Sequence, residues 1–193
     1  GEGVRVTSGG QHFFADRLVL ATGSWSGPLV ASCGVQLRVV RKHVHWLAND
    51  SSSYQTGSPV FFFETPEGDF YGFPQLDPRG IKVADHRGGE LLNNPDLLDR
   101  SVDAEDRIRV KSFLRNYLPD ISTRVTEHQV CMYTRSPDEH FVVDRHPEYR
   151  QVALVAGLSG HGFKFAPALA EAVYDLIFDR ASDRAIDFLS LAR

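Results

Sequence analysis

The chain contains two short apolar runs, one near each end, and each is followed at once by a turn rich in glycine and other small residues. The first run, 17–21, meets the turn Thr22–Gly27. The second run, 151–156, meets the turn Gly157–Lys164, and a helical pattern follows at Pro167–Phe178. Strands that are apolar at every position are typical of a sheet covered on both faces. Since strand, turn and helix build α/β domains, the sequence predicts one such domain made from two distant pieces.

Between these pieces, apolar and polar residues alternate in short runs, which is typical of antiparallel strands with one buried face. The predicted strands are Gln36–Leu47, Val60–Glu64, Phe70–Phe73, Ile81–Asp85 and Thr123–Val130. One amphipathic helix, Asp103–Tyr117, interrupts them with Asp103 as its N-cap. The segment Leu91–Arg100 is predicted to be a surface loop. We also expect a hairpin from Val4–Thr7 and His12–Phe14 around Gly9 and Gly10.

The predicted fold class is therefore mixed α/β and α+β. A predominantly antiparallel sheet domain with a flanking helix occupies 33–130, and the α/β domain that it interrupts occupies 1–32 and 131–193. A hydrophobic share of 42% and a charged share of 24% over 193 residues suit a folded chain with a sizeable core.

Charge and cysteine usage exclude several functions. The 21 Lys and Arg residues are outnumbered by 25 Asp and Glu residues and form no basic run, so nucleic acid is not an expected partner. The longest apolar stretches are far shorter than a membrane span, so no membrane partner is expected either. Two distant cysteines form neither a disulfide framework nor a zinc motif. With no signal-peptide pattern at the N-terminus, we expect a reducing, cytoplasmic location.

The turn Gly157–Lys164 is the most informative stretch for chemistry. Its glycines at i, i+3 and i+5 expose backbone N–H groups just before a predicted helix, where anions and electron-rich groups are favoured. The turn matches neither the Walker A pattern nor the G-x-G-x-x-G fingerprint, so it is either a ligand-facing loop or a tight structural turn. Lys164 lies between Phe163 and Phe165.

Three further patterns leave alternatives open. Cys131, placed at a predicted strand end with His128, Arg135 and His140 near it in sequence, is either a buried thiol or a nucleophile. His43 and His45 share a strand face, which suits packing, cofactor contact or a metal, although no third ligand is near in sequence. Lys82 points away from Ile81 and Val83, into solvent or a cavity.

Four motifs in the same order resemble one family of flavoenzymes, the monomeric sarcosine oxidases and N-methyltryptophan oxidases. They are LVLATGSWSG (Leu18–Gly27), FYGFPQLDPRGIKVADH (Phe70–His86), CMYTRSPDEHFVVD (Cys131–Asp144) and AGLSGHGFKFAP (Ala156–Pro167). The resemblance covers nearly the whole chain. It implies an FAD cofactor and an incomplete Rossmann-like FAD-binding domain at 1–32 and 131–193, with a substrate-binding sheet domain at 33–130.

The resemblance also implies which residues meet the cofactor. In this family the cysteine of the CMYT motif bears the flavin covalently through a thioether, which here is Cys131. The other expected cofactor contacts lie in the two turns: Thr22, Gly23, Trp25, Gly160, Gly162, Phe163 and Lys164.

The implied reaction is the oxidation of an N-methyl amino acid such as sarcosine to an imine, with oxygen reduced to hydrogen peroxide. By the resemblance, Lys82 promotes the reaction with oxygen and Lys164 pairs with the substrate carboxylate. The expected catalytic residues are Lys82, His86, Tyr71, Tyr133 and His161, and the expected substrate contacts are Phe62, Tyr71, Tyr133, Gly160 and Lys164.

The chain departs from the family pattern in one respect. It has no G-x-G-x-x-G turn to hold the ADP half of FAD. We therefore expect a C-terminal fragment of a longer oxidase, inactive alone and prone to self-association through exposed apolar surface. Two alternatives stay open: a non-catalytic binding or assembly module that needs a separate nucleotide-binding subunit, or a non-covalent FAD-dependent amino acid oxidase or dehydrogenase.

Overall fold

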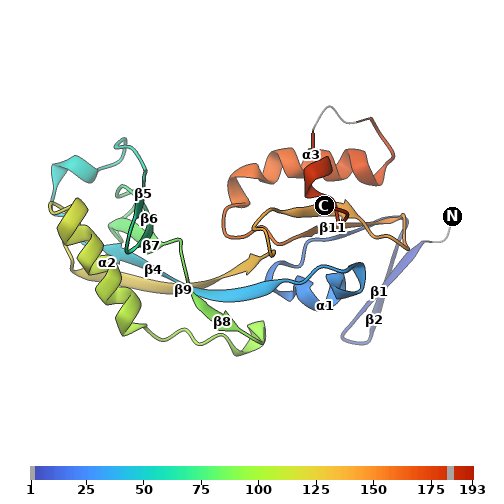
Figure 1. The fold of residues 1–193 in the computed structure, drawn as a ribbon, viewed down its shortest axis with the longest axis horizontal. Helices are drawn as coiled ribbons and strands as arrows, with labels where there is room; N and C mark the ends of the chain where they lie inside the picture. Colours follow the sequence, from blue (N-terminus) through green and yellow to red (C-terminus); the bar gives the residue numbers. More distant parts are fainter. Residues whose placement is uncertain (1–2, 182–184) are drawn as a thin grey trace. The chain divides into compact units, whose positions relative to one another are not determined.

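The computed structural model describes residues 3–181 and 185–193, which form two compact units (Figure 1). Unit 1 consists of Gly1–Val39 and Tyr133–Arg193, and unit 2 consists of Val40–Met132. The unit boundaries fall inside two long strands, β4 (Arg38–Leu47) and β9 (Val125–Arg135). The sequence predicts domain boundaries after residues 32 and 130, whereas the two units divide after Val39 and Met132.

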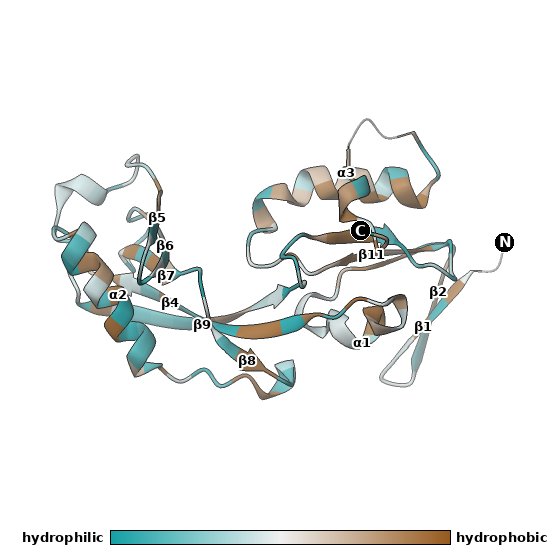
Figure 2. Ribbon diagram, viewed as in Figure 1, coloured by the Kyte–Doolittle hydropathy of each residue, from teal (hydrophilic) through white to brown (hydrophobic). Residues whose placement is uncertain are grey.

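Unit 1 contains a three-stranded sheet in the order β10-β11-β3. The strands are β10 (Val142–Arg145), β11 (Val152–Ala156) and β3 (Leu18–Leu20); β11 pairs antiparallel with β10 and parallel with β3. Figure 2 shows β11 as a hydrophobic strand. Its side chains alternate between two apolar clusters. One forms with α1 (Ser26–Val30), and the other with α3 (Ala166–Ile177). Burial on both sides explains why this strand is apolar at nearly every position.

The strand β3 differs from the prediction, because it is not buried on both faces. Leu18 and Leu20 are half-buried against the α1 side, whereas the side chain of Val19 is 44% exposed. Val19 is exposed because β3 is an edge strand: within the described sheet, β11 is its partner. A short apolar run cannot distinguish a central strand from an edge strand.

A hairpin precedes this sheet, as predicted. It joins β1 (Val4–Ser8) to β2 (Gln11–Ala15) through Gly9 and Gly10. Both glycines have positive φ, 54° and 79°, which is the conformation that a two-residue turn of the type I′ class requires.

Unit 2 is built on an antiparallel sheet in the order β5-β6-β7-β4-β8, with β9 also paired to β4. The additional strands are β5 (Phe61–Thr65), β6 (Gly68–Phe73), β7 (Ile81–Asp85) and β8 (Glu90–Leu92). One face of the sheet is covered by α2 (Ala104–Tyr117). The mixed class with a mostly antiparallel sheet is thus confirmed.

The core of unit 2 lies between this sheet and α2. Phe70, Ile81 and Val83 from the strands are fully buried, and the ring of Phe70 stacks on Phe113 of α2 at a centroid distance of 4.3 Å. Asp103 caps α2 as predicted, because its Oδ1 accepts from the backbone N–H groups of Glu105 and Asp106.

Two predictions in unit 2 need correction. The predicted loop at Leu91–Arg100 contains β8 and a single 3-10 turn, Pro95–Leu97, because Glu90–Leu92 adds to the edge of β4. The predicted strand Thr123–Val130 begins at Val125 and continues to Arg135, so Cys131 lies inside β9 and not at a strand end. Pairing of β9 with β4, and a bridge between Arg135 and Leu158, favour the longer strand over the turn-forming tendency of the residues beyond it.

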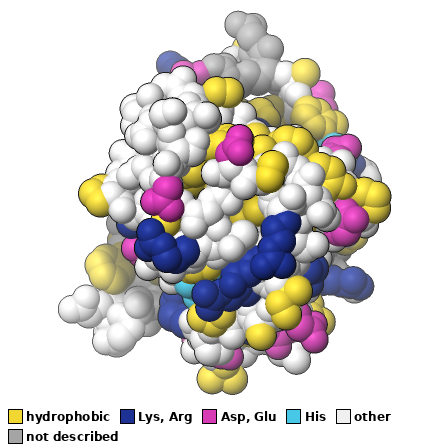
Figure 3. Space-filling view, turned by 90° about the vertical axis from the view of Figure 1, so that its left-hand side faces the viewer, with side chains coloured by type: hydrophobic (Ala, Val, Ile, Leu, Met, Phe, Trp, Pro, Cys, Tyr) yellow, Lys and Arg dark blue, Asp and Glu magenta, His cyan; other side chains and the backbone are white. Residues whose placement is uncertain are grey.

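No helix among the described residues is both long enough and apolar enough to span a bilayer. On the face shown in Figure 3, Lys and Arg side chains lie among acidic and apolar ones.

Candidate functional site

Side chains alternate between the two faces of the unit 2 sheet. Phe70, Ile81 and Val83 point to the α2 side, so their strand neighbours point to the opposite side. Five residues singled out by the sequence lie on strands of this sheet or directly after one, on the face away from α2. We call them the sheet-face group: Phe62, Tyr71, Lys82, His86 and Cys131.

Contacts across the strands hold much of this group together. Phe62 pairs with Tyr71 in the ladder, and the ring of His86 lies 6.1 Å from Phe62 and 6.3 Å from Tyr71, edge-on to both. Cys131 and Tyr71 pack against a small cluster made by Val44, Trp46 and Ala84. The sequence motifs, which are far apart along the chain, therefore meet on one sheet surface.

Lys82 is the cation of this surface. It is half-buried, and its Nζ lies 5.3 Å from the ring centroid of Phe73, 5.9 Å from that of Trp46 and 6.0 Å from that of Tyr71. Aromatic faces attract an ammonium and exclude some of its water. Of the two settings that the sequence allowed for Lys82, open solvent and a cavity, the structure shows a half-buried position among rings.

The thiol of Cys131 is half-buried and belongs to no disulfide. Burial raises the pKa of the Cys131 thiol, and the positive charges of Lys82 and then Lys42 act against that rise. A cysteine in this setting is not a reactive thiolate by itself, but the two lysines favour its ionised form.

Phe62 is the most open member of the group, with 54% of its side chain exposed. An aromatic ring that stands on a sheet face with this exposure is available for contact with another molecule or another part of the protein.

The remaining predicted residues lie in unit 1, and we call them the turn group: Thr22, Gly23, Trp25, Tyr133, Gly160, His161, Gly162, Phe163 and Lys164. Most of them come from the turns that follow β3 and β11. Because these two strands are parallel and in register, both turns leave the same edge of the sheet. Ligands bind at such an edge in α/β sheets.

The end of β9 connects the two turns. Thr134 Oγ1 donates to Ser24 Oγ at 3.2 Å in the first turn, and the carbonyl of Thr134 accepts from the N–H of Ser159 at 2.9 Å in the second. Thr22 Oγ1 shares a hydrogen bond of 3.0 Å with Ser26 Oγ. These bonds fix the backbone of both turns from one strand.

Gly160 is required by its neighbour Tyr133. Its φ is +85°, and a Cβ at this position would lie 2.3 Å from the Tyr133 ring, so the backbone lies directly on the aromatic face. The glycine-rich turn is therefore packed against Tyr133 at Gly160. This packing is compatible with both a ligand-facing loop and a tight structural turn.

Several side chains of the turn group point outward. Phe163 is 95% exposed, Trp25 is 49% exposed, and Lys164 is exposed with its Nζ 5.4 Å from the Phe165 ring. His161 is half-buried, with its ring 4.9 Å from that of Phe141. Exposed aromatic rings on a turn can stack on a planar ligand, and an exposed ammonium can pair with an anionic one.

Sequence reasoning missed a polar cluster between β4, β9 and α2. His43 Nδ1 shares a hydrogen bond of 2.9 Å with His128 Nε2, and His45 Nε2 donates to Asp106 Oδ2 at 2.8 Å. Burial is the main cause that lowers the pKa of His43 and of His128. Alternation along β4 predicted that His43 and His45 share a strand face, but only the fold brings His128 next to them.

No group of three or more His, Cys, Asp or Glu residues in the described parts is arranged to hold a metal ion.

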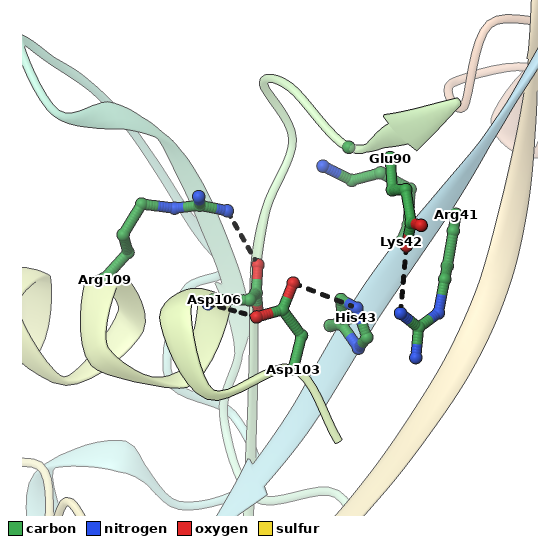
Figure 4. A pocket seen from close by; sticks show the side chains of 8 residues that line it. Arg41, Lys42, His43, Glu90, Asp103, Asp106 and Arg109 are labelled. Atoms are coloured by element: carbon green, nitrogen blue, oxygen red, sulfur yellow. Dashed lines mark hydrogen bonds and ion pairs between the residues drawn. The ribbon is translucent and has the colours of Figure 1, made fainter. Parts of the chain in front are cut away.

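Lys42 and Trp46 were also missed. Together with Val44 they occupy every second position of β4, on the face that carries Cys131. Both are buried: Lys42 is 3% exposed and Trp46 is 7% exposed. A cavity of about 150 Å³ lies beside this part of β4, lined by Arg41, Lys42, His43, Gly89, Glu90, Asp103, Asp106 and Arg109. Figure 4 shows the labelled side chains around it.

Comparison with known proteins assigns this architecture to a family. Residues 1–176 match the model of the DAO family, described as FAD dependent oxidoreductase. A monomeric sarcosine oxidase of Arthrobacter sp. (strain TE1826) is 33% identical over 196 residues, which cover 98% of this chain and 50% of that protein. An N-methyl-L-tryptophan oxidase of Salmonella arizonae is 35% identical over 181 residues, covering 92% of this chain and 48% of that protein.

Solved structures agree on the fold. A glycine oxidase from Geobacillus kaustophilus superposes with a TM-score of 0.75 at 20% identity, covering 99% of this chain and 49% of that one. Amadoriase I of Aspergillus fumigatus, a fructosyl amine:oxygen oxidoreductase, gives a TM-score of 0.76 at 22% identity, covering 96% and 44%. The chain spans about half the length of the curated relatives it matches.

Proposed function

Because the chain belongs to the DAO family of FAD-dependent oxidoreductases, we propose that it is the C-terminal part of an oxidase acting on N-methyl amino acids such as sarcosine. The amine is oxidised to an imine, and oxygen is reduced to hydrogen peroxide. The observation that carries this proposal is the sheet-face group, in which an ammonium, an imidazole, a phenol and a thiol lie on one open face of a rigid sheet.

The residues present suit a flavin. An isoalloxazine ring is planar and largely apolar, and the sheet face offers the half-buried aromatic ring of Tyr71 in the same cluster as the Cys131 thiol. The turn group offers backbone at Gly160 and Gly162 that approaches its neighbours closely, because a Cβ at either position would clash. FAD, when bound, supplies the acceptor for the electrons of the amine. In this proposal Cys131 carries it covalently through a thioether.

Lys82 is the residue we assign to oxygen activation. Its ammonium is held among three aromatic rings, so it provides a positive charge that is only partly hydrated. Such a charge stabilises the negative charge that develops when oxygen accepts an electron, and the stabilisation is several times larger than in bulk water. His86, beside Tyr71 and Phe62, is placed to hold or pass a proton on the same face.

We propose substrate contacts in the sheet-face group and in the turn group, and we describe each group by itself. On the sheet face, Tyr71 and Phe62 form apolar walls with a phenol at one end. In the turn group, Lys164 pairs with the substrate carboxylate, and Gly160, His161 and Tyr133 face the amine. A fixed carboxylate orients the C–H bond that reacts, which accelerates the reaction by positioning alone. The turn group also supplies the other cofactor contacts, Thr22, Gly23, Trp25 and Phe163.

The test uses the protein made from the complete reading frame that encodes these residues. Sarcosine and other N-methyl amino acids are added without oxygen, and loss of flavin absorbance is followed. Oxygen is then admitted and peroxide is measured. The proposal expects bleaching and then stoichiometric peroxide.

Lys82→Met separates the two half-reactions. It should slow the oxygen step by at least 100-fold, an estimate from removing one fixed charge at a reacting centre. Reduction by the amine should be affected much less. Lys111→Met, on α2 and so on the other side of the sheet, is the matched control and should leave both steps unchanged. Flavin that no amine reduces would overturn the proposal and favour a binding or assembly module.

A further inference from the structure

Asp85 is a buried carboxylate that the proposed function does not use. It is the last residue of β7, and His86 of the sheet-face group follows it directly. Only 3% of Asp85 is exposed. Alternation along β7 places its side chain on the α2 side of the sheet, with Ile81 and Val83, and His86 on the opposite side. Burying a carboxylate is costly unless hydrogen bonds or a counter-charge satisfy it, so its partners are informative.

The carboxylate of Asp85 holds the turn that contains His86. Asp85 Oδ1 accepts from the backbone N–H of Asp69 at 3.2 Å and from that of Arg87 at 2.9 Å. The backbone N–H of His86 donates to the carbonyl of Asp69 at 2.6 Å. The peptide groups on both sides of His86 are therefore hydrogen-bonded, one to Asp69 and the other to Asp85. Because peptide groups are planar, holding both of them fixes the direction in which the imidazole leaves the backbone.

Two further contacts tie the same turn to the sheet. Lys42 Nζ, on β4, donates to the carbonyl of Arg87 at 2.8 Å. The guanidinium of Arg87 donates to both carboxylate oxygens of Asp69 on β6, at 2.6 Å and 3.2 Å. The turn therefore cannot shift away from β4 and β6 without breaking these bonds.

The carboxylate itself is held from two directions. A Cβ on Gly68 would lie 3.0 Å from Asp85 Oδ1 and 3.1 Å from Oδ2, so the carboxylate packs directly on this glycine. Asp85 Oδ2 also lies 3.6 Å from Nε of Arg109 on α2, whose NH2 group pairs with Asp106 at 3.1 Å. Asp85 thus has a fixed position beneath the sheet, and the turn takes its position from it.

The imidazole of His86 emerges on the open side. It is half-buried and lies edge-on to the rings of Phe62 and Tyr71, at centroid distances of 6.1 Å and 6.3 Å. A group that takes up or passes a proton must lie within hydrogen-bond reach of the reacting atom. A displacement of about 1 Å in such a group is enough to lower a rate substantially.

We propose that Asp85 is a positioning residue for His86, which it holds against Phe62 and Tyr71 by fixing the turn after β7 from the buried side of the sheet. The inference rests on the proposed function in one respect, namely that His86 acts on the amine substrate. Asp85 works here as a hydrogen-bond acceptor for two backbone N–H groups. An amide oxygen at the same place should therefore serve nearly as well as the carboxylate.

Histidine NMR measures the placement of His86 without relying on turnover. The complete protein is labelled with histidine carrying ¹³C at Cε1, and the His86→Gln variant identifies the His86 signal. Ring currents of Phe62 and Tyr71 give this signal a position that differs from that of free histidine. Asp85→Ala should move it toward the free position. The signals of His43 and His128 in the same unit report whether the fold is intact.

A graded series separates hydrogen bonding from charge. Asp85→Asn keeps an acceptor oxygen without the charge and should retain the His86 signal. Asp85→Ser offers a weaker acceptor and should move the signal part of the way, and it decides the question if Asp85→Ala does not fold. The matched control is Asn94→Ala, which removes the same kind of bond, from the N–H of Asp96 to Asn94 Oδ1, at an exposed position. It should leave the signal unchanged.

The two half-reactions give a second readout. Asp85→Ala should slow reduction of the flavin by the amine on the order of 100-fold and leave the oxygen step, which we assign to Lys82, nearly unchanged. In a His86→Gln protein, the same change at Asp85 should add little further loss, because Asp85 acts through His86. Losses that add in full would overturn the inference and give Asp85 a role independent of His86.

A folded Asp85→Ala or Asp85→Ser protein with the wild-type His86 signal would also overturn the inference. This outcome is separable from failure of the proposed function. A displaced signal in a protein whose flavin no amine reduces would leave the coupling of Asp85 to His86 standing while the oxidase proposal fails. An active oxidase whose folded Asp85 variants keep the signal would do the reverse.

Discussion

The two faces of the unit 2 sheet are made from the same strands but differ in burial. Along β6 and β7, Phe70, Ile81 and Val83 turn toward α2 and are fully buried, while Tyr71 and Lys82 turn the other way and remain partly open. Period-two alternation therefore sends one residue to the core and the next to the candidate site. We therefore expect changes at adjacent residues to alter stability and the proposed function independently.

The largest effect is expected on the covered face. Phe70→Ala removes a fully buried ring that stacks on Phe113, and it should lower the free energy of unfolding by about 3–5 kcal/mol. Phe62→Ala makes the same chemical change on the open face, where the ring is 54% exposed, and should cost less than about 1 kcal/mol. Urea unfolding followed by circular dichroism measures both. Equal losses would show that the open face is also part of the stabilising core.

We expect the stability of the protein to depend on pH because of two histidines on the α2 side of the sheet, His43 and His128. Burial is the main cause that lowers the pKa of His43 and of His128 below the ordinary 6.5, so both are neutral in the folded protein at pH 7. The unfolded chain takes up protons below pH 6.5 before the folded protein does. The free energy of unfolding should therefore be highest above pH 6.5 and fall as the pH drops through the lowered folded pKa values.

The double variant His43→Val with His128→Gln tests this dependence. Its free energy of unfolding should change less between pH 7 and pH 5 than that of the wild type, because the two imidazoles that resist protonation are gone. Urea unfolding at four pH values in this window is sufficient. The same slope in both proteins would assign the pH dependence to other groups.

A smaller effect is expected at the start of α2. Asp103→Ala removes the acceptor for two backbone N–H groups and should cost about 1 kcal/mol. Asp120→Ala, at an exposed position beyond the helix, is the matched control and should change the free energy of unfolding by less than about 0.5 kcal/mol. If the two variants lose the same stability, the cap does not hold α2 against the sheet.

The smallest effect on stability is expected on the open face itself. Tyr71→Phe keeps the ring and removes only the phenolic hydroxyl, so the free energy of unfolding should stay within about 0.5 kcal/mol of wild type. Under the proposed function, the KM for the amine should nevertheless change, because the hydroxyl faces the substrate. An unchanged KM would remove Tyr71 from the proposed substrate contacts.

Much of this arrangement could be predicted from the sequence where local patterns decide it. The hairpin turn at Gly9 and Gly10, the cap at Asp103 and most of the strands of unit 2 follow from turn chemistry, capping and alternation. The family was predicted from four motifs and is confirmed by the match over residues 1–176.

The errors arose where pairing between distant segments decides the structure. The strand β9, which pairs with β4, runs through Cys131 to Arg135, where it bridges to Leu158. The edge strand β3 has β11 as its neighbour, and its Val19 is exposed. His128 joins His43, and Lys42 reaches the turn after His86, only through the sheet register. No local pattern contains these contacts. The roles of the sheet-face and turn groups in catalysis stay predictions.

The most direct test of the account is to find where the flavin is attached. The protein from the complete reading frame is denatured, digested and separated, and the peptide that absorbs as a flavin is sequenced by mass spectrometry. We expect the flavin to remain bound after denaturation and to reside on the peptide containing Cys131, and we expect Cys131→Ser to abolish the attachment. A flavin released completely by denaturation of the wild-type protein, or found on another residue, would contradict it.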